Sequence, residues 1–343
     1  MDALSAILGA IRLRGALYFE VHAAEPWVSV SPSMTDIGGV VMPDGHHVIP
    51  FHIVLSGRAW ARPTDRSLPP SALGPGDIIM FPGGASHVMS SSCDPGDLPE
   101  VNLQLYRDAA QRDAPFTLLE IGGRGEQAVF VCGYLCCDAG PFNPLLGALP
   151  PMLIVRPPAD ESDLTRNLLR AALDENGSGA TGSEAVLAKL SELMFVQALR
   201  WHINSLGSGD FGWLSALRDE RVARALHLIH TRPTEHWSLA SLAEASAASR
   251  SRLAGDFHHF TGESPMRYLA RWRMQLAAGM LQNSAASIAQ VAERVGYESE
   301  AAFKRTFKKF VGSPPGQWRR AMRMADVPVA SGAPRAMART IAH

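Results

Sequence analysis

The chain has 343 residues but only four cysteines, and their spacing matches no zinc-finger pattern; they are Cys93, Cys132, Cys136 and Cys137. No apolar run reaches about 18 residues, the length that a membrane-spanning helix requires. The opening residues, MDALSAILGAIRLRG, include an early acidic residue and no small-residue cleavage site, so they lack the pattern of a secretory leader. We therefore expect a cytoplasmic protein with reduced thiols and no membrane partner.

The formal net charge is only −1, yet the charges are distributed unevenly along the chain. Residues 1–217 contain 13 Lys and Arg against 23 Asp and Glu, a net charge of −10, whereas residues 218–324 contain 17 against 9, a net charge of +8. A basic C-terminal third is typical of a module that meets nucleic-acid phosphates, although a solvated basic surface gives the same count.

Two structural patterns follow one another along the chain. From Tyr18 to about Tyr106, short apolar runs alternate with Gly, Pro and Asp clusters, which predicts a β-sandwich or barrel. Residues 163–175 and 184–206 have helical spacing and are separated by NGSGATGS, which predicts an antiparallel helical hairpin. The apolar stripe of the second helix is consistent with packing inside the chain or with a homodimer contact.

The breaks in pattern predict a multidomain α+β protein. We expect a β-rich domain over 1–158, a helical hairpin and linker over 159–210, an all-α domain over 211–324, and a disordered tail over 325–343 that is rich in Ala, Pro and Gly. The linker ends in the flexible sequence Gly-Ser-Gly-Asp at 207–210.

An internal repeat dominates the all-α domain. Ser249-Arg-Ser-Arg-Leu253, with Phe257, Phe260, Gly262 and Pro265 after it, recurs 50 residues later as Ser299-Glu-Ala-Ala-Phe303, with Phe307, Phe310, Gly312 and Pro315 after it. A Ser N-cap, apolar residues at i, i+4 and i+7, and a closing Gly and Pro specify a short amphipathic helix in each copy.

Another short helix is predicted before each copy, over 239–247 and over 288–295, with Gly296 in the second turn. The pattern is therefore helix-turn-helix, twice, with a longer helix over 266–281 between the units. If both second helices enter the major groove on one face of the duplex, they reach sites roughly 34 Å apart and can bend the DNA.

At these residues the chain resembles the AraC family of bacterial transcription regulators, over about residues 220–320. The stretch AERVGYESEAAFKRTFKKFVGSPPGQWR, residues 292–319, matches the family signature nearly position by position. The resemblance implies sequence-specific binding to double-stranded promoter DNA, contact with RNA polymerase, activation of transcription and a homodimer.

The same resemblance indicates the DNA-binding residues, which are Ser249, Arg250, Ser251, Arg252 and Gly255 in the first unit, and Ser299, Ala301, Lys304, Arg305, Lys308 and Lys309 in the second. Ala254 and Gly255 replace long polar side chains, so the first unit is expected to rely on backbone or shape contacts. Arg305 is the best candidate for a base contact, with guanine as the commonest partner, and Lys308 and Lys309 are expected on phosphates.

The segment from Gly76 to His87, GDIIMFPGGASH, resembles the second motif of the cupins, which implies a cupin-like jelly-roll barrel. The first cupin motif is degraded, and the expected carboxylate ligand is missing. His52 and His87, with His46 or His47 at the rim, could bind an effector or a metal ion, since three imidazoles suffice for a soft or borderline metal. The alternatives are structural histidines and an apolar effector in the barrel.

The whole chain is similar to cupin-bearing AraC-type regulators, a group that includes reactive-chlorine-sensing regulators. That branch uses a reactive cysteine, and Cys132-Gly133 resembles a segment there, which makes Cys132 a redox candidate. The first 30 residues contain no cysteine, and no Lys, Arg or His lies in VFVCGYLCCD to activate a thiolate, which favours buried-strand cysteines instead.

The leading hypothesis is thus a transcription regulator, not an enzyme, whose cupin-like domain senses a small molecule, metal or oxidant and changes promoter binding. A cupin metal enzyme with a DNA-binding appendage is the alternative, against which the missing carboxylate ligand counts. An architectural DNA-binding protein would show weak sequence preference and no effector.

Overall fold

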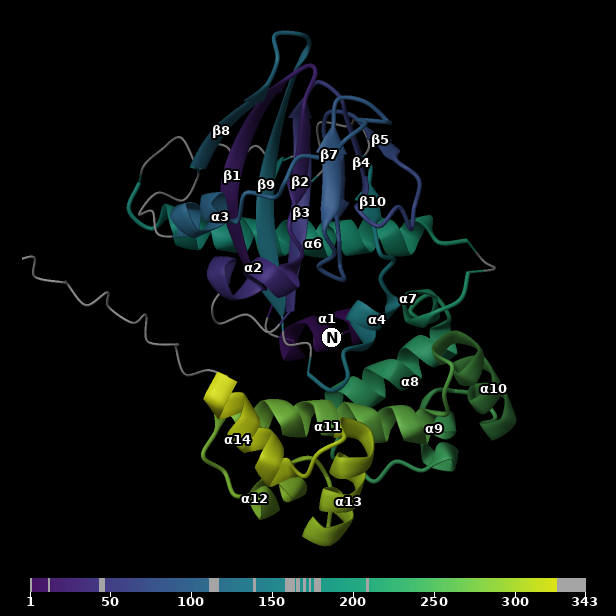
Figure 1. Cartoon of the computed structure of the whole chain (residues 1–343). Helices are drawn as coiled ribbons and strands as arrows, with labels where there is room; N and C mark the ends of the chain where they lie inside the picture. The colour runs from purple at the N-terminus through teal and green to yellow at the C-terminus, as the bar shows by residue number, and fades with distance from the viewer. Residues whose placement is uncertain are drawn as a thin grey trace, which may run out of the picture.

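The structure is a computed structural model of the chain. It describes residues 2–11, 13–42, 47–110, 117–137, 140–157, 180–207 and 210–325, with seven further positions between 164 and 175. Within these ranges a β-rich domain is followed by a helical domain, one above the other in Figure 1. The predicted multidomain α+β class is confirmed.

The strands of the β domain form two sheets. The six-stranded sheet has the order β10-β6-β3-β9-β1-β8, and the four-stranded sheet has the order β2-β7-β4-β5. Their bounds are β1 Arg14–Ala24, β2 Val28–Ser31, β3 His47–Ser56, β4 Ala59–Pro63, β5 Ser71–Leu73, β6 Ile78–Met80, β7 His87–Ser90, β8 Thr117–Gly122, β9 Gln127–Cys137 and β10 Leu153–Val155. Between described residues, no strand pairing joins the two sheets into a single closed barrel.

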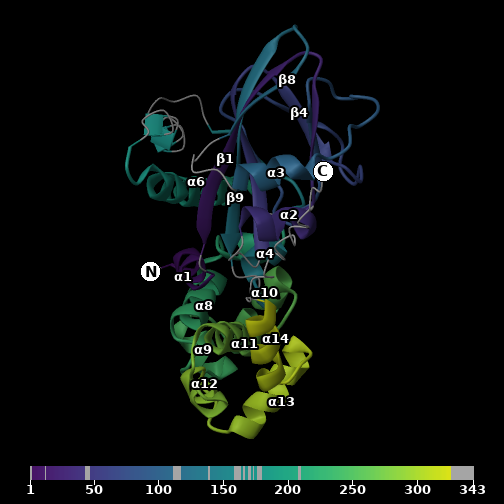
Figure 2. The ribbon, with the colours of Figure 1, turned by 60° about the vertical axis from the view of Figure 1, so that its left-hand side comes forward.

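Among the described residues, the helices that accompany these sheets include α1 Ala3–Ala10, α2 Met34–Val41, α3 Leu103–Ala110, α4 Pro144–Ala148 and α6 Ser183–Ser205. Helix α6 matches the predicted second helix of the hairpin and packs across β1. The approach is close at Gly15, where an added Cβ would lie 2.5 Å from the Cβ of Ser191. Of residues 163–175, the predicted first helix, the structure describes seven positions, and each of these is helical. Figure 2 shows α6 running along the β domain from the side.

The helical domain consists of α7 Trp213–Ala216, α8 Glu220–Thr231, α9 Leu239–Ala245, α10 Arg250–Thr261, α11 Pro265–Asn283, α12 Ile288–Arg294, α13 Glu300–Val311 and α14 Pro315–Ala325. The predicted caps are confirmed. Ser249 Oγ accepts from Arg252 N at 3.3 Å, and Ser299 Oγ accepts from Ala302 N at 3.4 Å. Gly262 and Gly312 follow α10 and α13 in the left-handed conformation that glycine favours.

The buried apolar residues divide into three clusters. One lies between the two sheets and includes Phe19 and Phe130. A second runs from α1 and the outer face of the six-stranded sheet through α6 and α8 to the N-terminal half of α11, where it includes Trp272. The third is confined to α11–α14 and includes Phe303 and Phe307.

Some details differ from the sequence prediction. Helices α2 and α3 interrupt the region predicted as strands, and the Ser33 side chain that caps α2 was the local signal for the first of them. Helix α9 ends at Ala245 instead of residue 247, because Ala247 has a φ of 54° and cannot continue a right-handed helix. The predicted tail beyond Ala325 lies outside the described residues. In the part of the chain that is described, no helix is long and apolar enough to cross a membrane.

Candidate functional site

The second helix of the first unit, α10, buries one face and exposes the other. Leu253 and Phe257 are fully buried against the unit, which turns the intervening positions outward. Of the predicted DNA-binding residues, Ser249, Arg250, Ser251, Arg252 and Gly255 are all exposed, whereas Ala254 is half-buried. The exposed face thus carries few long side chains.

Helix α13 of the second unit repeats this arrangement with different chemistry. Phe303 and Phe307 are fully buried, and the exposed predicted residues are Ser299, Ala301, Lys304, Arg305, Lys308 and Lys309. Four of these are long basic side chains, so α13 presents a strongly cationic face.

The arginines of the two exposed faces differ in their partners. Arg252 donates from Nε to Asp256 Oδ2 at 2.7 Å, one helical turn away, so its charge is partly neutralised. Arg305 makes no ion pair with any described residue, while its neighbour Lys304 pairs with Glu300. At the repeat position of Arg305 the first unit has Gly255, and no described atom would contact a Cβ added there.

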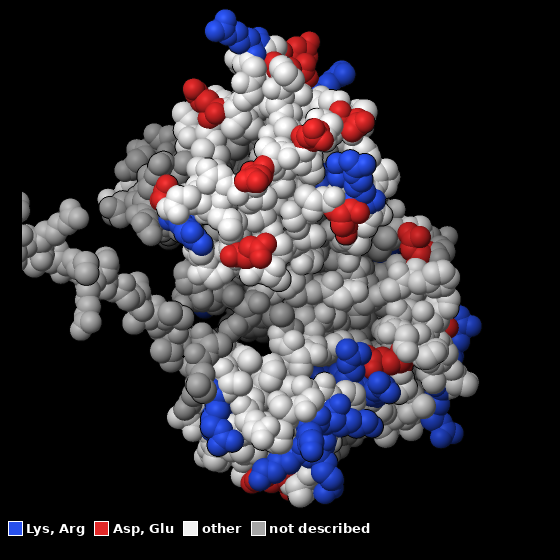
Figure 3. All heavy atoms as spheres, viewed as in Figure 1, with Lys and Arg blue, Asp and Glu red and all other residues white. Residues whose placement is uncertain are grey.

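The charge split of the sequence is visible on the surface. In Figure 3, Lys and Arg gather on the helical domain, and most of the acidic side chains in view are dispersed over the β domain. The helical domain is therefore the part of the molecule suited to a polyanion.

A cavity of about 120 Å³ lies inside the β domain, between the two sheets and α3. It is lined mostly by apolar and aromatic side chains, including Phe19, Val21, Tyr106 and Phe130, together with His52 and Cys132. His52 and Cys132 are directly paired across β3 and β9, which brings residues 80 positions apart to one wall.

Three side chains form a hydrogen-bonded row beside this cavity. Cys132 Sγ lies 2.8 Å from His52 Nδ1, and His52 Nε2 lies 2.6 Å from His87 Nε2. His87 Nδ1 lies 3.0 Å from the carbonyl oxygen of Ala85, to which it must donate. Therefore His87 Nε2 accepts from His52 Nε2, and His52 Nδ1 accepts from the thiol of Cys132.

This order of protons requires three uncharged groups. Burial lowers the pKa of His87 to about 4, and burial together with His87 lowers the pKa of His52 well below its ordinary value. Burial also raises the pKa of the Cys132 thiol. Cys132 is thus a protonated, half-buried thiol, which is the state of an unreactive cysteine rather than of a thiolate nucleophile.

The predicted cluster of three imidazoles does not form among the described residues. His52 and His87 meet as expected, but His47 bonds to the Pro82 carbonyl and lies five residues from His52 on β3; His46 lies outside the described residues. A metal ion requires converging donors, whereas Cys132 and His87 face opposite nitrogens of His52. The described part of the chain contains no group of three His, Cys, Asp or Glu suited to a metal ion.

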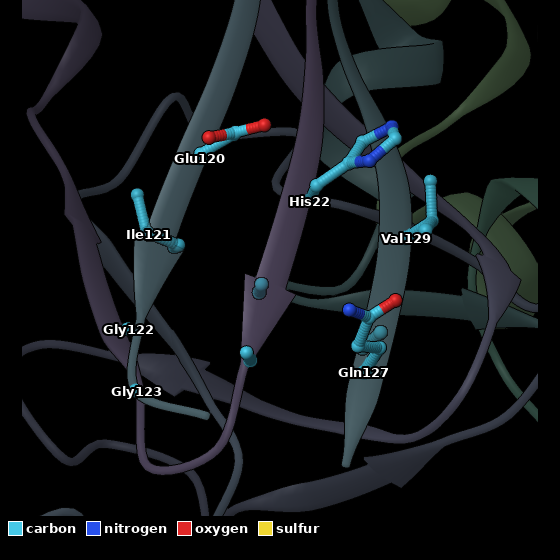
Figure 4. A pocket seen from close by; sticks show the side chains of 10 residues that line it. His22, Glu120, Ile121, Gly122, Gly123, Gln127 and Val129 are labelled. Atoms are coloured by element: carbon cyan, nitrogen blue, oxygen red, sulfur yellow. The ribbon is translucent and has the colours of Figure 1, made fainter. Parts of the chain in front are cut away.

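A larger hollow of about 380 Å³ lies at the ends of β1, β8 and β9. Figure 4 shows His22, Glu120 and Gln127 around it, with Gly122 and Gly123 at its edge. The imidazole of His22 already pairs with Glu20, at 2.9 Å. This hollow is open to solvent and shares no residue with the cavity apart from Ile121.

The two domains meet at the loop after β9. Phe142 N donates to Gln275 Oε1 of α11 at 2.9 Å, and the Phe142 ring lies 4.0 Å from the guanidinium carbon of Arg271. The same ring meets Tyr268 edge-on at 5.3 Å, and Tyr268 meets Phe257 of α10 at 5.5 Å. A continuous row of rings therefore links the β domain to the first unit's exposed helix.

Arg271 extends this contact to a buried carboxylate. Its Nη1 donates to Glu263 Oε1 at 3.0 Å, directly after the end of α10. Sequence reasoning did not identify Phe142, Gln275, Arg271 or the cavity residue Tyr106 as functional, because contacts across 133 positions leave no local pattern.

Comparisons with known proteins agree with this geometry. Residues 2–204 match the family model described as Cupin, and residues 242–321 match the one described as Helix-turn-helix domain. A putative AraC-like transcription regulator of Streptomyces lividans is 29% identical over 320 residues, covering 93% of this chain and 98% of the relative.

Two further relatives come from other bacteria. The HTH-type transcriptional regulator AlkR of Acinetobacter baylyi is 28% identical over 323 residues, covering 93% of this chain and 99% of the relative. The RCS-specific HTH-type transcriptional activator RclR of Escherichia coli is 28% identical over 202 residues, covering 58% of this chain and 70% of the relative.

Proposed function

The chain belongs to the cupin family through its N-terminal domain and is an AraC-type transcription regulator, and we propose that it reads promoter DNA chiefly with α13. Because the relatives are transcription regulators, it is not a cupin enzyme. The observation that carries the proposal is the exposed face of α13, where Arg305 is free of any described ion pair.

In this proposal the two units have different tasks on the duplex. Arg305 donates both guanidinium arms to one base edge in the major groove, and guanine presents the matching pair of acceptors. Lys308 and Lys309 lie one turn further along the same helix and bind phosphates. Helix α10, with Gly255 at the position of Arg305, follows the backbone and shape of the neighbouring groove.

The β domain acts as the sensor, and Phe142 transmits its state. A molecule in the cavity contacts β9 through Cys132, and the loop that follows β9 carries Phe142 onto α11. A shift of that loop would change how α11 holds α10 relative to α13, which is a coupling between two distinct sites.

Two partners complete the proposal. Helix α6 exposes Val186 and Leu193, seven residues apart on one face, at 44% and 48%, and we expect a second copy of the chain to cover them. RNA polymerase in the cytoplasm is the expected partner at the promoter.

The test is protection of the chain's own upstream DNA at physiological salt, with a scrambled duplex as control. The proposal predicts two protected major-groove segments about one helical turn apart, with the segment under α13 more sensitive to base substitution. Equal affinity for both duplexes would overturn sequence-specific reading at this site.

A further inference from the structure

The size of the β-domain cavity limits what it can hold. Its volume is about 120 Å³. An engineered apolar cavity of about 150 Å³ in another protein holds one benzene molecule. The β-domain cavity is somewhat smaller than that, so a single small ring is the largest group that it can hold.

The wall of the cavity selects for aromatic and uncharged ligands. Four aromatic rings line it, those of Phe19, Tyr106, Phe130 and Tyr134, and none of its described lining residues is Asp, Glu, Lys or Arg. A charged ligand would lose its hydration there without gaining an ionic partner, which is costly. The edges and faces of the four rings favour an aromatic ligand.

The hydrogen-bonded row beside the cavity is already complete. His52 uses both of its nitrogens, one toward Cys132 and one toward His87, and the order of protons leaves no donor of His52 for a ligand. Tyr106 bonds with Ser31. Ser29 also lines the cavity, and its hydroxyl makes no hydrogen bond with a described residue.

We propose that the cavity binds a neutral, monocyclic aromatic molecule bearing one hydroxyl group, with the chemistry of a phenol, and that Ser29 bonds to this hydroxyl. This inference rests on the proposed function only in assigning the cavity to the effector. The ring lies among the four aromatic side chains, and its hydroxyl lies at the β2 wall.

The experiment is calorimetric titration of the full chain with phenol, benzene and benzoate at pH 7.5. Phenol is expected to bind saturably at one site per chain, more tightly than benzene and at least about tenfold more tightly than benzoate, which is ionised at this pH. No saturable binding of phenol, or benzoate binding as tightly as phenol, would overturn the proposal.

Variants locate the site. Val21→Phe fills the cavity from β1 and should weaken phenol binding at least about tenfold, whereas Val129→Phe, in the outer hollow, should not. Leu119→Phe fills the cavity from β8, in case Val21→Phe does not fold. Ser29→Ala should make the affinities for phenol and benzene equal. Unchanged phenol binding in the folded cavity-filling variants, or an unchanged phenol preference in Ser29→Ala, contradicts the assignment.

The same samples separate this inference from the proposed function. Binding of the full chain to its own upstream DNA is measured in parallel. Specific DNA binding without phenol binding rejects the ligand class and leaves the regulator intact. Phenol binding without specific DNA binding supports the ligand class and rejects the proposed function.

Discussion

The two helix-turn-helix units share one sequence pattern but differ in the buried core that each packs against and in the side chains that each exposes. In the first unit, Leu253 and Phe257 belong to a buried cluster that continues through α8 and α1 to the β domain. In the second unit, Phe303 and Phe307 belong to a cluster confined to α11–α14. On the exposed face, α10 has Gly255 at the position where α13 has Arg305. The two units thus differ in their surroundings: the first is attached to the β domain, and the second carries the exposed Arg305 that we propose reads the DNA sequence.

The middle helix α11 makes this division possible. Tyr268 and Trp272 in its N-terminal half pack into the cluster shared with the β domain, while Met274 and Leu281 pack into the second unit's own core. Figure 1 shows α11 running between the two units. A rigid helix with a different core at each end can pass a change of orientation to both exposed helices.

The largest effect on stability is expected from a substitution in one of the two buried clusters, and it tests whether the clusters are separate. Phe303→Ala removes a fully buried ring and should lower the free energy of unfolding by about 3–5 kcal/mol. Segment-resolved hydrogen exchange should show reduced protection in α12–α14, with α1 and α8 unaffected. The matched variant Leu253→Ala should reduce protection in α8 as well. Equal reduction in α1 and α8 from both variants would show that the cores are not separate.

A smaller effect is expected at the domain contact. Phe142→Ala removes the ring that lies over Arg271 and against Tyr268, and should lower the free energy of unfolding by about 2 kcal/mol. Exchange should rise in α10 and the first half of α11. Phe211→Ala, at a side chain that is 69% exposed, is the control and should change stability little. Unchanged hydrogen exchange in α10 would contradict a link from the β domain to the first unit.

How much of this could be predicted from the sequence depends on the range of the interactions. The caps at Ser249 and Ser299 and the glycines after α10 and α13 are local, so helices α9 to α13 were predicted nearly element by element. The row from Cys132 to His52 and His87 depends on strand register between β3 and β9, and on β7 from the other sheet. Register of this kind has no local sequence signal.

The placement of His47 shows the same limit. His46, His47 and His52 are close in sequence, but alternation along β3 and the contact of His47 with Pro82 place His47 apart from the pair formed by His52 and His87. The helices α2 and α3 were missed because they interrupt a region whose composition is typical of strands. Ala247 ended α9 early because its conformation is set by the turn into α10.

The salt dependence of DNA binding should distinguish the C-terminal turns of α10 and α13. Lys308 and Lys309 have His258 and His259 at the corresponding positions of the first unit. Lys308→Ala with Lys309→Ala should flatten the slope of log K against log salt by about 1 for each phosphate that is no longer bound, equally on all sequences. His258→Lys with His259→Lys should steepen it. Lys189→Ala on α6 is the control. If this variant changes the slope as much as the double lysine variant does, the assignment is contradicted.

The smallest expected effect concerns the two turns. Ala247 adopts a φ of 54°, whereas the second unit has Gly296 with a φ of 80° at the equivalent place. Ala247→Gly should raise the free energy of unfolding by about 0.5–1 kcal/mol, because glycine adopts this conformation without strain. Gly296→Ala should do the opposite, since its Cβ would lie 2.9 Å from the Thr234 carbonyl oxygen. Thermal unfolding of both variants measures whether each substitution raises or lowers the stability.

The central claim is that α13 reads the sequence and α10 does not, and a paired affinity measurement tests it directly. Binding of wild type, Arg305→Ala and Arg252→Ala to the chain's own upstream DNA and to scrambled DNA is compared at one salt concentration. Arg305→Ala should weaken binding to the upstream DNA by about 1–3 kcal/mol and leave scrambled DNA nearly unaffected, while Arg252→Ala, already paired with Asp256, should lower both affinities slightly. A larger, sequence-dependent decrease from Arg252→Ala than from Arg305→Ala would contradict the account.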